Sequence, residues 1–127
     1  MKLVIQRVKK ASVKVNKEIV GSIDKGLLVL VGIAHEDTEK TADYLAKKLC
    51  NLRIFEDEND KMNFSLKDIN GELLIISQFT LYGDCKKSGN RPSFSDSANS
   101  SIALPLYDYF VSECAKQISI VKTGNFR

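Results

Sequence analysis

Leu73-Leu74-Ile75-Ile76-Ser77-Gln78-Phe79-Thr80-Leu81-Tyr82-Gly83-Asp84 passes from an aliphatic run into polar and aromatic residues. The aliphatic run predicts a buried strand, and the glycine and aspartate that end the stretch predict a loop. Side chains alternate between the two faces of a strand, so one face is expected to present an amide, a hydroxyl and a phenol. Such a row is unusual in a core strand and indicates a ligand site at the rim of a sheet. The row is Gln78, Thr80 and Tyr82, with Ser77, Phe79 and Leu81 on the opposite face.

The patterns on either side of this stretch predict an α+β fold. A helix is expected from Asp37 or Thr38, and a second one over residues 101–116, with Pro105 in its first turn. A long loop covers residues 83–100. The fold class is therefore a mostly antiparallel sheet with two packed helices. The expected strands are residues 2–8, 11–15, 19–23, 27–33 and 118–122, and the buried helix stripes are Ala42, Leu45, Ala46 and Leu49, then Ile102, Leu106, Phe110 and Cys114.

The size and composition of the chain suit one globular domain. It has 127 residues, of which 43% are hydrophobic and 28% are charged. Its longest apolar run, Leu27 to Val31, is far shorter than the roughly 20 residues that cross a bilayer. Gln6 and Arg7 interrupt the first apolar residues too early for a secretory signal. We therefore expect a cytoplasmic protein without a membrane partner.

The few cysteines and the single histidine limit which disulfides, metal sites and nucleophiles the chain can form. Cys50, Cys85 and Cys114 are far apart in the sequence, and His35 is the only histidine. This pattern argues against a disulfide framework and against a zinc site, so we expect no metal and no other cofactor. Cys50 and Cys114 are expected in the core. Cys85 and His35 carry no local signature of a nucleophile with its base, and His35 is expected at the surface.

The net charge is +3, and positive residues gather in two places. Those within residues 1–25 are interpreted as solvated surface. Lys86, Lys87 and Arg91 directly follow the polar stretch. Their position makes them the better candidates for contacts with RNA phosphates.

Three polar residues need a chemical explanation. Thr80 can be a nucleophile, but no neighbouring base is visible, and an ordinary strand residue is the simpler interpretation. Gln78 has two amide donors and a carbonyl to satisfy. Arg7 shares a strand face with Leu3 and Ile5, so it must pair with a carboxylate, with carbonyls or with an RNA phosphate. These residues predict a polar site without identifying a reaction.

Several separated blocks are specific: Met62-Asn63, Ser77 to Tyr82, Arg91-Pro92-Ser93-Phe94 and Leu106-Tyr107. Together with residues 4–8, 11–13, 26–32, 43–48 and 52–55, they cover nearly the whole chain. In these blocks the chain resembles the D-aminoacyl-tRNA deacylases, which remove D-amino acids wrongly attached to tRNA. The resemblance implies a deacylase-like fold that is barrel-like in the dimer. It also implies hydrolysis of the ester between a D-amino acid and the terminal ribose of tRNA.

The resemblance assigns roles to individual residues. Residues 77–80 match the family's active-site motif, and the N–H of Phe79 is expected to hold the scissile carbonyl. The lack of a base favours assistance by the 2′-hydroxyl of the tRNA, with Thr80 positioning the substrate; the alternative is Thr80 as nucleophile. Arg7 and Met62 match substrate or supporting positions.

The family is dimeric, and a Gly-Pro motif from one subunit completes the pocket of the other and excludes L side chains. Arg7 matches an arginine that supports this motif. In the family the motif follows the equivalent of residues 123–126, whereas this chain ends at Arg127. We therefore expect residues 1–127 to form a single deacylase domain without its last strand segment. Expected partners are D-aminoacyl-tRNA and a second copy, not DNA; the alternative function is a catalytically impaired tRNA-binding remnant of the same fold.

Overall fold

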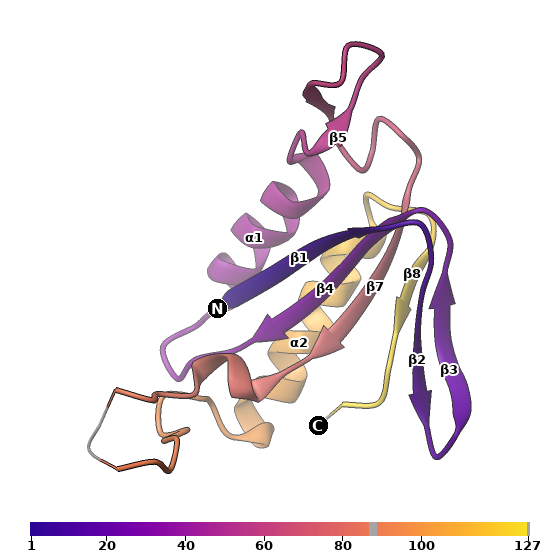
Figure 1. The fold of residues 1–127 in the computed structure, drawn as a ribbon. Helices are drawn as coiled ribbons and strands as arrows, with labels where there is room; N and C mark the ends of the chain where they lie inside the picture. Colours follow the sequence, from indigo (N-terminus) through magenta and orange to yellow (C-terminus); the bar gives the residue numbers. More distant parts are fainter. Residues whose placement is uncertain (87–88, 127) are drawn as a thin grey trace.

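The computed structural model of the protein describes residues 1–86 and 89–126 (Figure 1). No helix in this described part of the chain is long and apolar enough to span a membrane. The predicted α+β class is confirmed. In chain order the elements are β1 (Lys2–Val8), β2 (Ala11–Val15), β3 (Glu18–Ile23), β4 (Gly26–Gly32), α1 (Glu39–Asn51), β5 (Phe55–Glu56), β6 (Met62–Phe64), β7 (Glu72–Ser77), the 3₁₀ helix η1 (Phe79–Tyr82), α2 (Ser100–Ala115) and β8 (Val121–Thr123).

The central sheet is mixed and has the strand order β1-β4-β7-β8. β1 is antiparallel to β4, whereas β7 is parallel to both β4 and β8. β2 with β3 and β5 with β6 form antiparallel hairpins. The β4–β7 and β7–β8 pairs are parallel because a helix connects each pair as a crossover, which parallel strands require.

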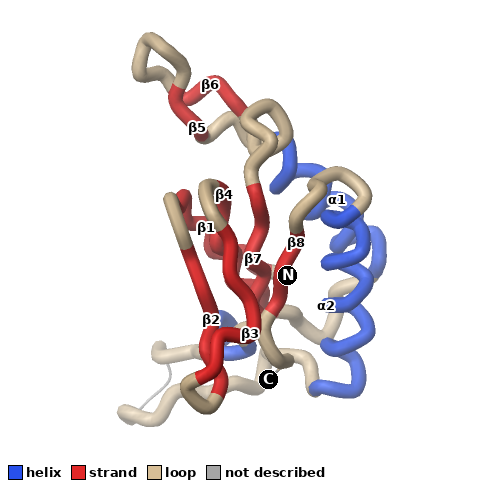
Figure 2. The backbone as a smooth tube through the Cα atoms, turned by 90° about the vertical axis from the view of Figure 1, so that its right-hand side faces the viewer, coloured by secondary structure: helices blue, strands red, loops and turns tan. Residues whose placement is uncertain are grey.

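Both helices cover the same face of the central sheet, and the β2–β3 hairpin lies on the other face (Figure 2). The crossovers through α1 and through α2 each step to the next strand in the same direction. Because such crossovers are right-handed, two steps in one direction place both helices on one side. The end of β7 therefore lies between a helix layer and a hairpin layer.

The hydrophobic core lies between the sheet and the two helices. Alternate residues of β4 and β7 point into it and are at most 1% exposed. The stripe predicted for α1 is confirmed, with Leu45 partly buried, and so is the burial of Cys50 and Cys114. The buried strand residues are Leu27, Val29, Val31, Leu73 and Ile75, and those of the helices are Ala42, Ala46, Leu49, Cys50, Ala103, Leu106, Tyr107, Phe110 and Cys114.

The start of α1 is where the sequence predicts it. Thr38 is the residue before the helix, and its N–H donates to Thr41 Oγ1 at 3.2 Å. Asp37 has a different role, because its Oδ2 accepts from the Ala34 N–H at 2.8 Å and lies 2.5 Å from the terminal ammonium of Met1. These contacts tie the beginning of the chain to the loop that follows β4.

Two details of the prediction for α2 are wrong. The helix begins at Ser100, so Pro105 lies inside it rather than in the first turn. Pro105 is exposed, and water can satisfy the carbonyl of Ser101, which loses its N–H partner. Ile102 was expected in the buried stripe but is 45% exposed, whereas Ala103 is buried. The rest of the predicted stripe, Leu106, Phe110 and Cys114, is buried as expected.

Three boundaries also differ from the expectation. Glu18 belongs to β3, because a two-residue turn with both φ angles positive closes the β2–β3 hairpin. No strand was expected over residues 55–64, where the β5–β6 hairpin forms with residues 57–61 as its turn. β8 begins at Val121 rather than at Ile118, whose N–H still bonds to the end of α2.

Candidate active site

β7 ends at Ser77, and the chain then turns into η1. The Gln78 N–H still bonds to Val31 O at 2.8 Å, but β4 ends at Gly32 and β8 stops short of this level. Without a partner strand on either side, an extended chain would leave its backbone groups unpaired. The expected strand alternation through Tyr82 is therefore wrong.

Gln78 and Thr80 come together in spite of this turn. Gln78 Nε2 donates a hydrogen bond to Thr80 Oγ1. This bond leaves the side-chain carbonyl of Gln78 as an acceptor and the hydroxyl hydrogen of Thr80 as a donor. Gln78 is partly buried and Thr80 is exposed. The pair thus offers one acceptor and one donor at the end of a rigid strand.

Tyr82 leaves this polar group and packs against β4. A Cβ on Gly32 would lie 3.0 Å from Leu81 Cβ and 3.2 Å from the Tyr82 ring, so glycine lets η1 approach the strand. The Lys2 ammonium is 4.6 Å from the ring centroid. Burial raises the pKa of the Tyr82 phenol, with a further contribution from the carboxylates of residues 36–37. The phenol is therefore neutral at physiological pH.

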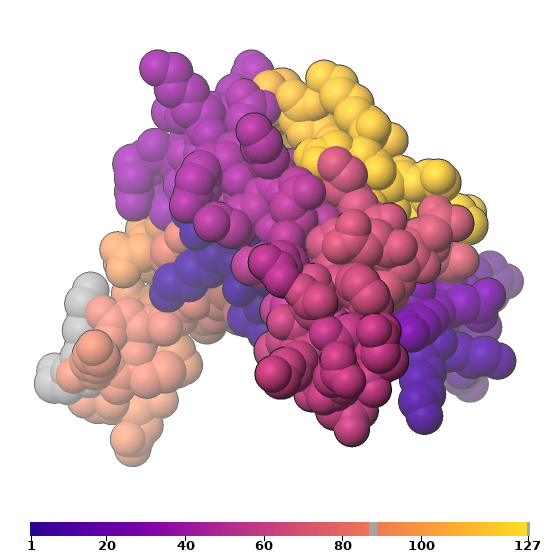
Figure 3. All heavy atoms as spheres, turned by 90° about the horizontal axis from the view of Figure 1, so that it is seen from above, coloured from indigo at the N-terminus to yellow at the C-terminus, as the bar shows by residue number. Residues whose placement is uncertain are grey.

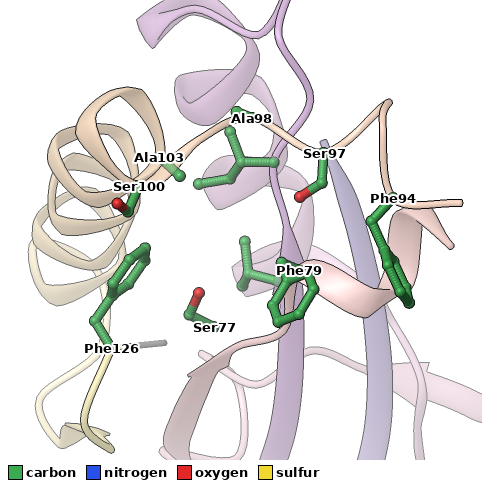
Figure 4. A pocket seen from close by; sticks show the side chains of 10 residues that line it. Ser77, Phe79, Phe94, Ser97, Ala98, Ser100, Ala103 and Phe126 are labelled. Atoms are coloured by element: carbon green, nitrogen blue, oxygen red, sulfur yellow. The ribbon is translucent and has the colours of Figure 1, made fainter.

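A pocket of about 250 Å³ lies between the end of β7 and α2 (Figure 4). Ser77 and Phe79 line it, and Phe126 lies on the side opposite Phe79. Phe79 is 46% exposed, and its ring makes an edge contact with Phe94 at a centroid distance of 5.4 Å. Small and apolar residues form the remaining wall: Val31, Ile33, Ser97, Ala98, Ser100 and Ala103.

A second pocket, of about 380 Å³, shares Ser77 and Phe79 with the first. Gln78 lines only this second pocket, together with Lys14 of β2. The end of β7 therefore separates two spaces, one toward α2 and one toward the β2–β3 hairpin. The other residues of the second wall are Val13, Val15, Ile76, Gly124 and Asn125.

Sequence reasoning missed several of these wall residues. Lys14 was included among the lysines interpreted as solvated surface, and nothing local connects it with Gln78. Phe126 was also missed, and nothing local connects it with residues 77–80. These residues meet only because β2, α2 and the segment after β8 surround one strand end.

The start of η1 places backbone donors beside the pockets. The first hydrogen bond of η1 runs from the Leu81 N–H to Gln78 O at 3.3 Å. The N–H groups of Phe79 and Thr80 precede this bond and have no acceptor within the helix. Two adjacent N–H donors at the rim of a pocket can stabilise an oxygen on which negative charge develops.

Tyr107 of α2 supports β7 just before the site. Its hydroxyl donates to Ile75 O at 2.7 Å inside the core. Burial, with a smaller contribution from Asp108, raises the pKa of Tyr107 to about 12. The hydroxyl therefore stays protonated and keeps its hydrogen bond at neutral pH. Its ring also contacts Phe126 at a centroid distance of 5.6 Å, which joins the strand support to the pocket wall.

Arg7 and Met62 lie at the other end of the sheet from Ser77. Arg7 is aligned with Leu27 of β4, whereas Ser77 is aligned with Val31. Four residues along a strand correspond to about 13 Å. The structure therefore does not bring Arg7 to the 77–80 segment of the same chain.

Arg7 finds its partners on the β5–β6 side of the molecule. Its Nη1 donates to Ile54 O at 2.9 Å and lies 3.9 Å from Glu56 Oε1. A carbonyl and a carboxylate were two of the three expected partners. Glu56 is aligned with Met62, which is 61% exposed on β6.

The loop after η1 carries the basic residues that were expected to contact RNA. Asp84 and Ser93 close this loop with two backbone hydrogen bonds, of 2.7 and 2.9 Å. Lys86 and Arg91 are exposed on it. Lys87 lies outside the described residues.

Cys85 and His35 are both exposed. His35 Nε2 lies 2.7 Å from Ser95 O, and no contact between His35 and Cys85 is found in the described part of the chain. The surface position expected for His35 is confirmed.

The fold and the site define an α+β protein with a polar strand end between two pockets. The family model described as D-Tyr-tRNA(Tyr) deacylase matches residues 4–127. The chain therefore belongs to the D-Tyr-tRNA(Tyr) deacylase family.

Two relatives agree with this assignment, and two solved structures are similar in fold. D-aminoacyl-tRNA deacylases of Bacillus cereus (strain B4264) and Bacillus anthracis (strain CDC 684 / NRRL 3495) are 60% and 59% identical over 126 residues, 99% of this chain and 86% of each relative. A structure named c-Myc DNA Unwinding Element Binding Protein is 40% identical with a TM-score of 0.91, covering 99% of this chain and 85% of that one. A probable eukaryotic D-amino acid tRNA deacylase, 18% identical with a TM-score of 0.80 over 98% of this chain and 87% of that one, shares the fold.

Proposed function

We propose that this chain hydrolyses the ester that joins a D-amino acid to the terminal ribose of a tRNA. The observation that carries this proposal is the Gln78–Thr80 pair beside the first N–H groups of η1, between two pockets. Relatives with 60% identity that are named D-aminoacyl-tRNA deacylases support the substrate class. The two pockets offer separate places for the amino acid and for the terminal nucleoside.

In the proposed reaction, the oxygen of a water molecule adds to the ester carbonyl, and the carbonyl oxygen becomes an oxyanion. The N–H of Phe79 stabilises this oxyanion, and such an interaction is stronger in the transition state than with the substrate. The bond to the ribose oxygen then breaks, and that oxygen takes the proton that the attacking water gives up. The products are a free D-amino acid and a tRNA with a free terminal hydroxyl.

We propose that Thr80 positions the substrate and does not attack it. A nucleophilic hydroxyl needs a base that accepts its proton. The partner of Thr80 Oγ1 is Gln78 Nε2, which is a donor and cannot accept that proton. The 2′-hydroxyl of the terminal ribose is then the group that assists the attack of water.

The purified chain is expected to release free D-tyrosine from D-Tyr-tRNA faster than it releases L-tyrosine from L-Tyr-tRNA. Thr80→Val, which removes the hydroxyl and keeps the shape, is expected to lower kcat by about tenfold, because a positioning contact contributes roughly 1.4 kcal/mol to the barrier. A substrate with a 2′-deoxy terminal ribose is expected to react more slowly than the normal one. Equal rates for both stereoisomers would contradict the function. Loss of all activity in Thr80→Val would instead support Thr80 as the nucleophile.

We propose that the chain acts as a homodimer. Val4, Met62 and Phe64 are 49%, 61% and 37% exposed, although large apolar side chains favour burial. The separation of Arg7 from Ser77 along the sheet also supports a second copy, because Arg7 can then serve the partner's pocket. Sedimentation equilibrium is expected to give twice the chain mass, and Val4→Asp is expected to shift the protein toward monomer. A monomer mass at every concentration would contradict this proposal.

The substrate class also bears on location and partners. Because aminoacyl-tRNA is consumed in translation, we propose that the chain acts in the cytoplasm. RNA is then its nucleic-acid partner, and the absence of a DNA partner stays a prediction.

A further inference from the structure

A basic pocket of about 630 Å³ lies at the C-terminal end of α1. Four cationic side chains line it and no acidic one does. We propose that this basic pocket binds the phosphate backbone of the tRNA, an inference that rests on the proposed function. The cations are Lys47, Lys48, Arg53 and Lys67, and Tyr44, Asn51, Leu52 and Gln117 complete the wall.

The basic pocket is assembled from separate segments. Lys47 and Lys48 come from the last turns of α1, Arg53 from the loop after it, and Lys67 from the loop before β7. The view from above in Figure 3 shows α1 and the following loop beside the segment after α2. Gln117 of that segment closes the wall. Convergence of four cations from three segments concentrates positive charge on a chain whose net charge is only +3.

Among the described residues, none of these four cations forms an ion pair. Asp68 is the carboxylate whose pKa the charges of Arg53 and Lys67 help to lower, after larger contributions from Ser65. Asp68 Oδ2 already accepts from the Ser65 N–H at 2.9 Å. Asp68 does not line the basic pocket, so a phosphate there would meet four cations with no carboxylate in the wall.

Arg53 and Tyr44 add features that suit RNA. Asn63 orients the Arg53 guanidinium: Arg53 Nε donates to Asn63 O at 2.9 Å, and Nη2 donates to the side-chain oxygen. The remaining N–H donors of the fork can bind a phosphate. Tyr44 is 63% exposed, and Lys48 Nζ lies 5.7 Å from its ring centroid. Exposed aromatic rings beside cations are typical of surfaces that bind RNA.

A simpler explanation covers only part of the cluster. The C-terminus of a helix attracts cations, and this accounts for Lys48 in the last turn. It does not account for Arg53 and Lys67, which lie outside the helix. Two carbonyls at this end are already bonded, Lys48 O to the Leu52 N–H at 2.9 Å and Lys47 O to Asn51 Nδ2 at 2.7 Å. These two carbonyls therefore repel a phosphate less than carbonyls without a hydrogen-bond donor would.

The test uses the variant K47Q/K48Q/K67Q and the matched control K9Q/K10Q/K25Q, which removes the same charge from exposed lysines outside the basic pocket. Binding of uncharged tRNA is measured against salt concentration, and kcat/KM is measured for D-Tyr-tRNA and for the D-tyrosyl ester of adenosine. In the variant, the slope of log K against log salt is expected to fall by about 2 to 3, because each lost phosphate contact removes about 0.7–0.9. The ratio of kcat/KM for the tRNA to that for the small ester is expected to fall by about tenfold or more.

Three results are decisive. An unchanged slope and an unchanged ratio in the triple variant would overturn the proposal. An equal fall of both in the control would also overturn it, because it would show that only the overall positive charge of the protein attracts RNA. A fall in the slope and in the ratio that occurs in K47Q/K48Q/K67Q but not in the control supports the proposal. If the triple variant does not fold, the single variant K67Q is measured in its place. If neither ester is hydrolysed by the unmodified chain, the proposed function fails, while the binding slope still reports on the basic pocket.

Discussion

Phe79→Pro is expected to lower kcat for D-Tyr-tRNA about 100- to 1000-fold relative to Phe79→Ala, the loss expected when one oxyanion donor is removed. Both variants lose the aromatic ring, but only proline also removes the backbone N–H. Proline fits here because Phe79 is the first residue of η1, a position where its fixed φ is tolerated. Gln78 before it has φ −144° and ψ 89°, which lies outside the α region that a following proline disfavours.

Single-turnover rates with D-Tyr-tRNA measure this difference, and tRNA binding by each variant shows whether the substrate still docks. Thermal unfolding monitored by circular dichroism checks that both variants fold. Equal rates for Phe79→Pro and Phe79→Ala would show that the Phe79 N–H does not hold the oxyanion. The Thr80 N–H, the second donor at the start of η1, would then be the candidate.

Gly26→Ala is expected to destabilise the fold by about 4 kcal/mol or more, a loss that few single substitutions reach. A Cβ at this position would lie 1.9 Å from Glu72 O and 2.6 Å from Glu72 N. Both are backbone atoms of β7, the strand paired with β4 at this residue. The clash cannot be relieved by a side-chain rotation, so the two central strands must separate.

Gly124→Ala is the matched control for Gly26→Ala. Its added Cβ would lie 3.3 Å from side-chain atoms of Ile76 and Val13, which can move by a few tenths of an ångström. We expect it to change the free energy of unfolding by no more than about 1 kcal/mol, as for substitutions without a named clash. Urea unfolding with a fitted m-value measures both variants. A loss in Gly26→Ala no larger than in Gly124→Ala would contradict the steric argument.

Local periodicity predicted the helices and most of the core. The α1 stripe and the burial of Cys50 and Cys114 are as expected, because apolar spacing records which face of a helix is covered. The boundaries of α2 were less predictable. Pro105 is tolerated inside the helix because it lies on the exposed side, and exposure is not visible in the sequence.

The part of the candidate site that is contiguous in the sequence was predictable, whereas the part that folding brings together was not. Residues 77–80 stand together in the sequence, and their polar character after a buried strand indicated a site. The walls around them come from β2, α2 and residues 124–126, which are far apart along the chain. No spacing rule connects Lys14 or Phe126 with Gln78, so only the folded chain shows the two pockets.

The sequence alone determined the α+β class, the family resemblance and the polar Ser77–Thr80 segment. These properties depend on neighbouring residues and on their periodicity. Only the tertiary structure decided that the strand stops at Ser77 and turns into η1, because the pairing with β8 ends at Ile75 and β4 offers its last hydrogen bond to the Gln78 N–H. That turn brings Gln78 onto Thr80 and leaves the Phe79 N–H at the rim of the pockets. The absence of a partner strand is a property of the whole sheet, and therefore no local pattern could predict it.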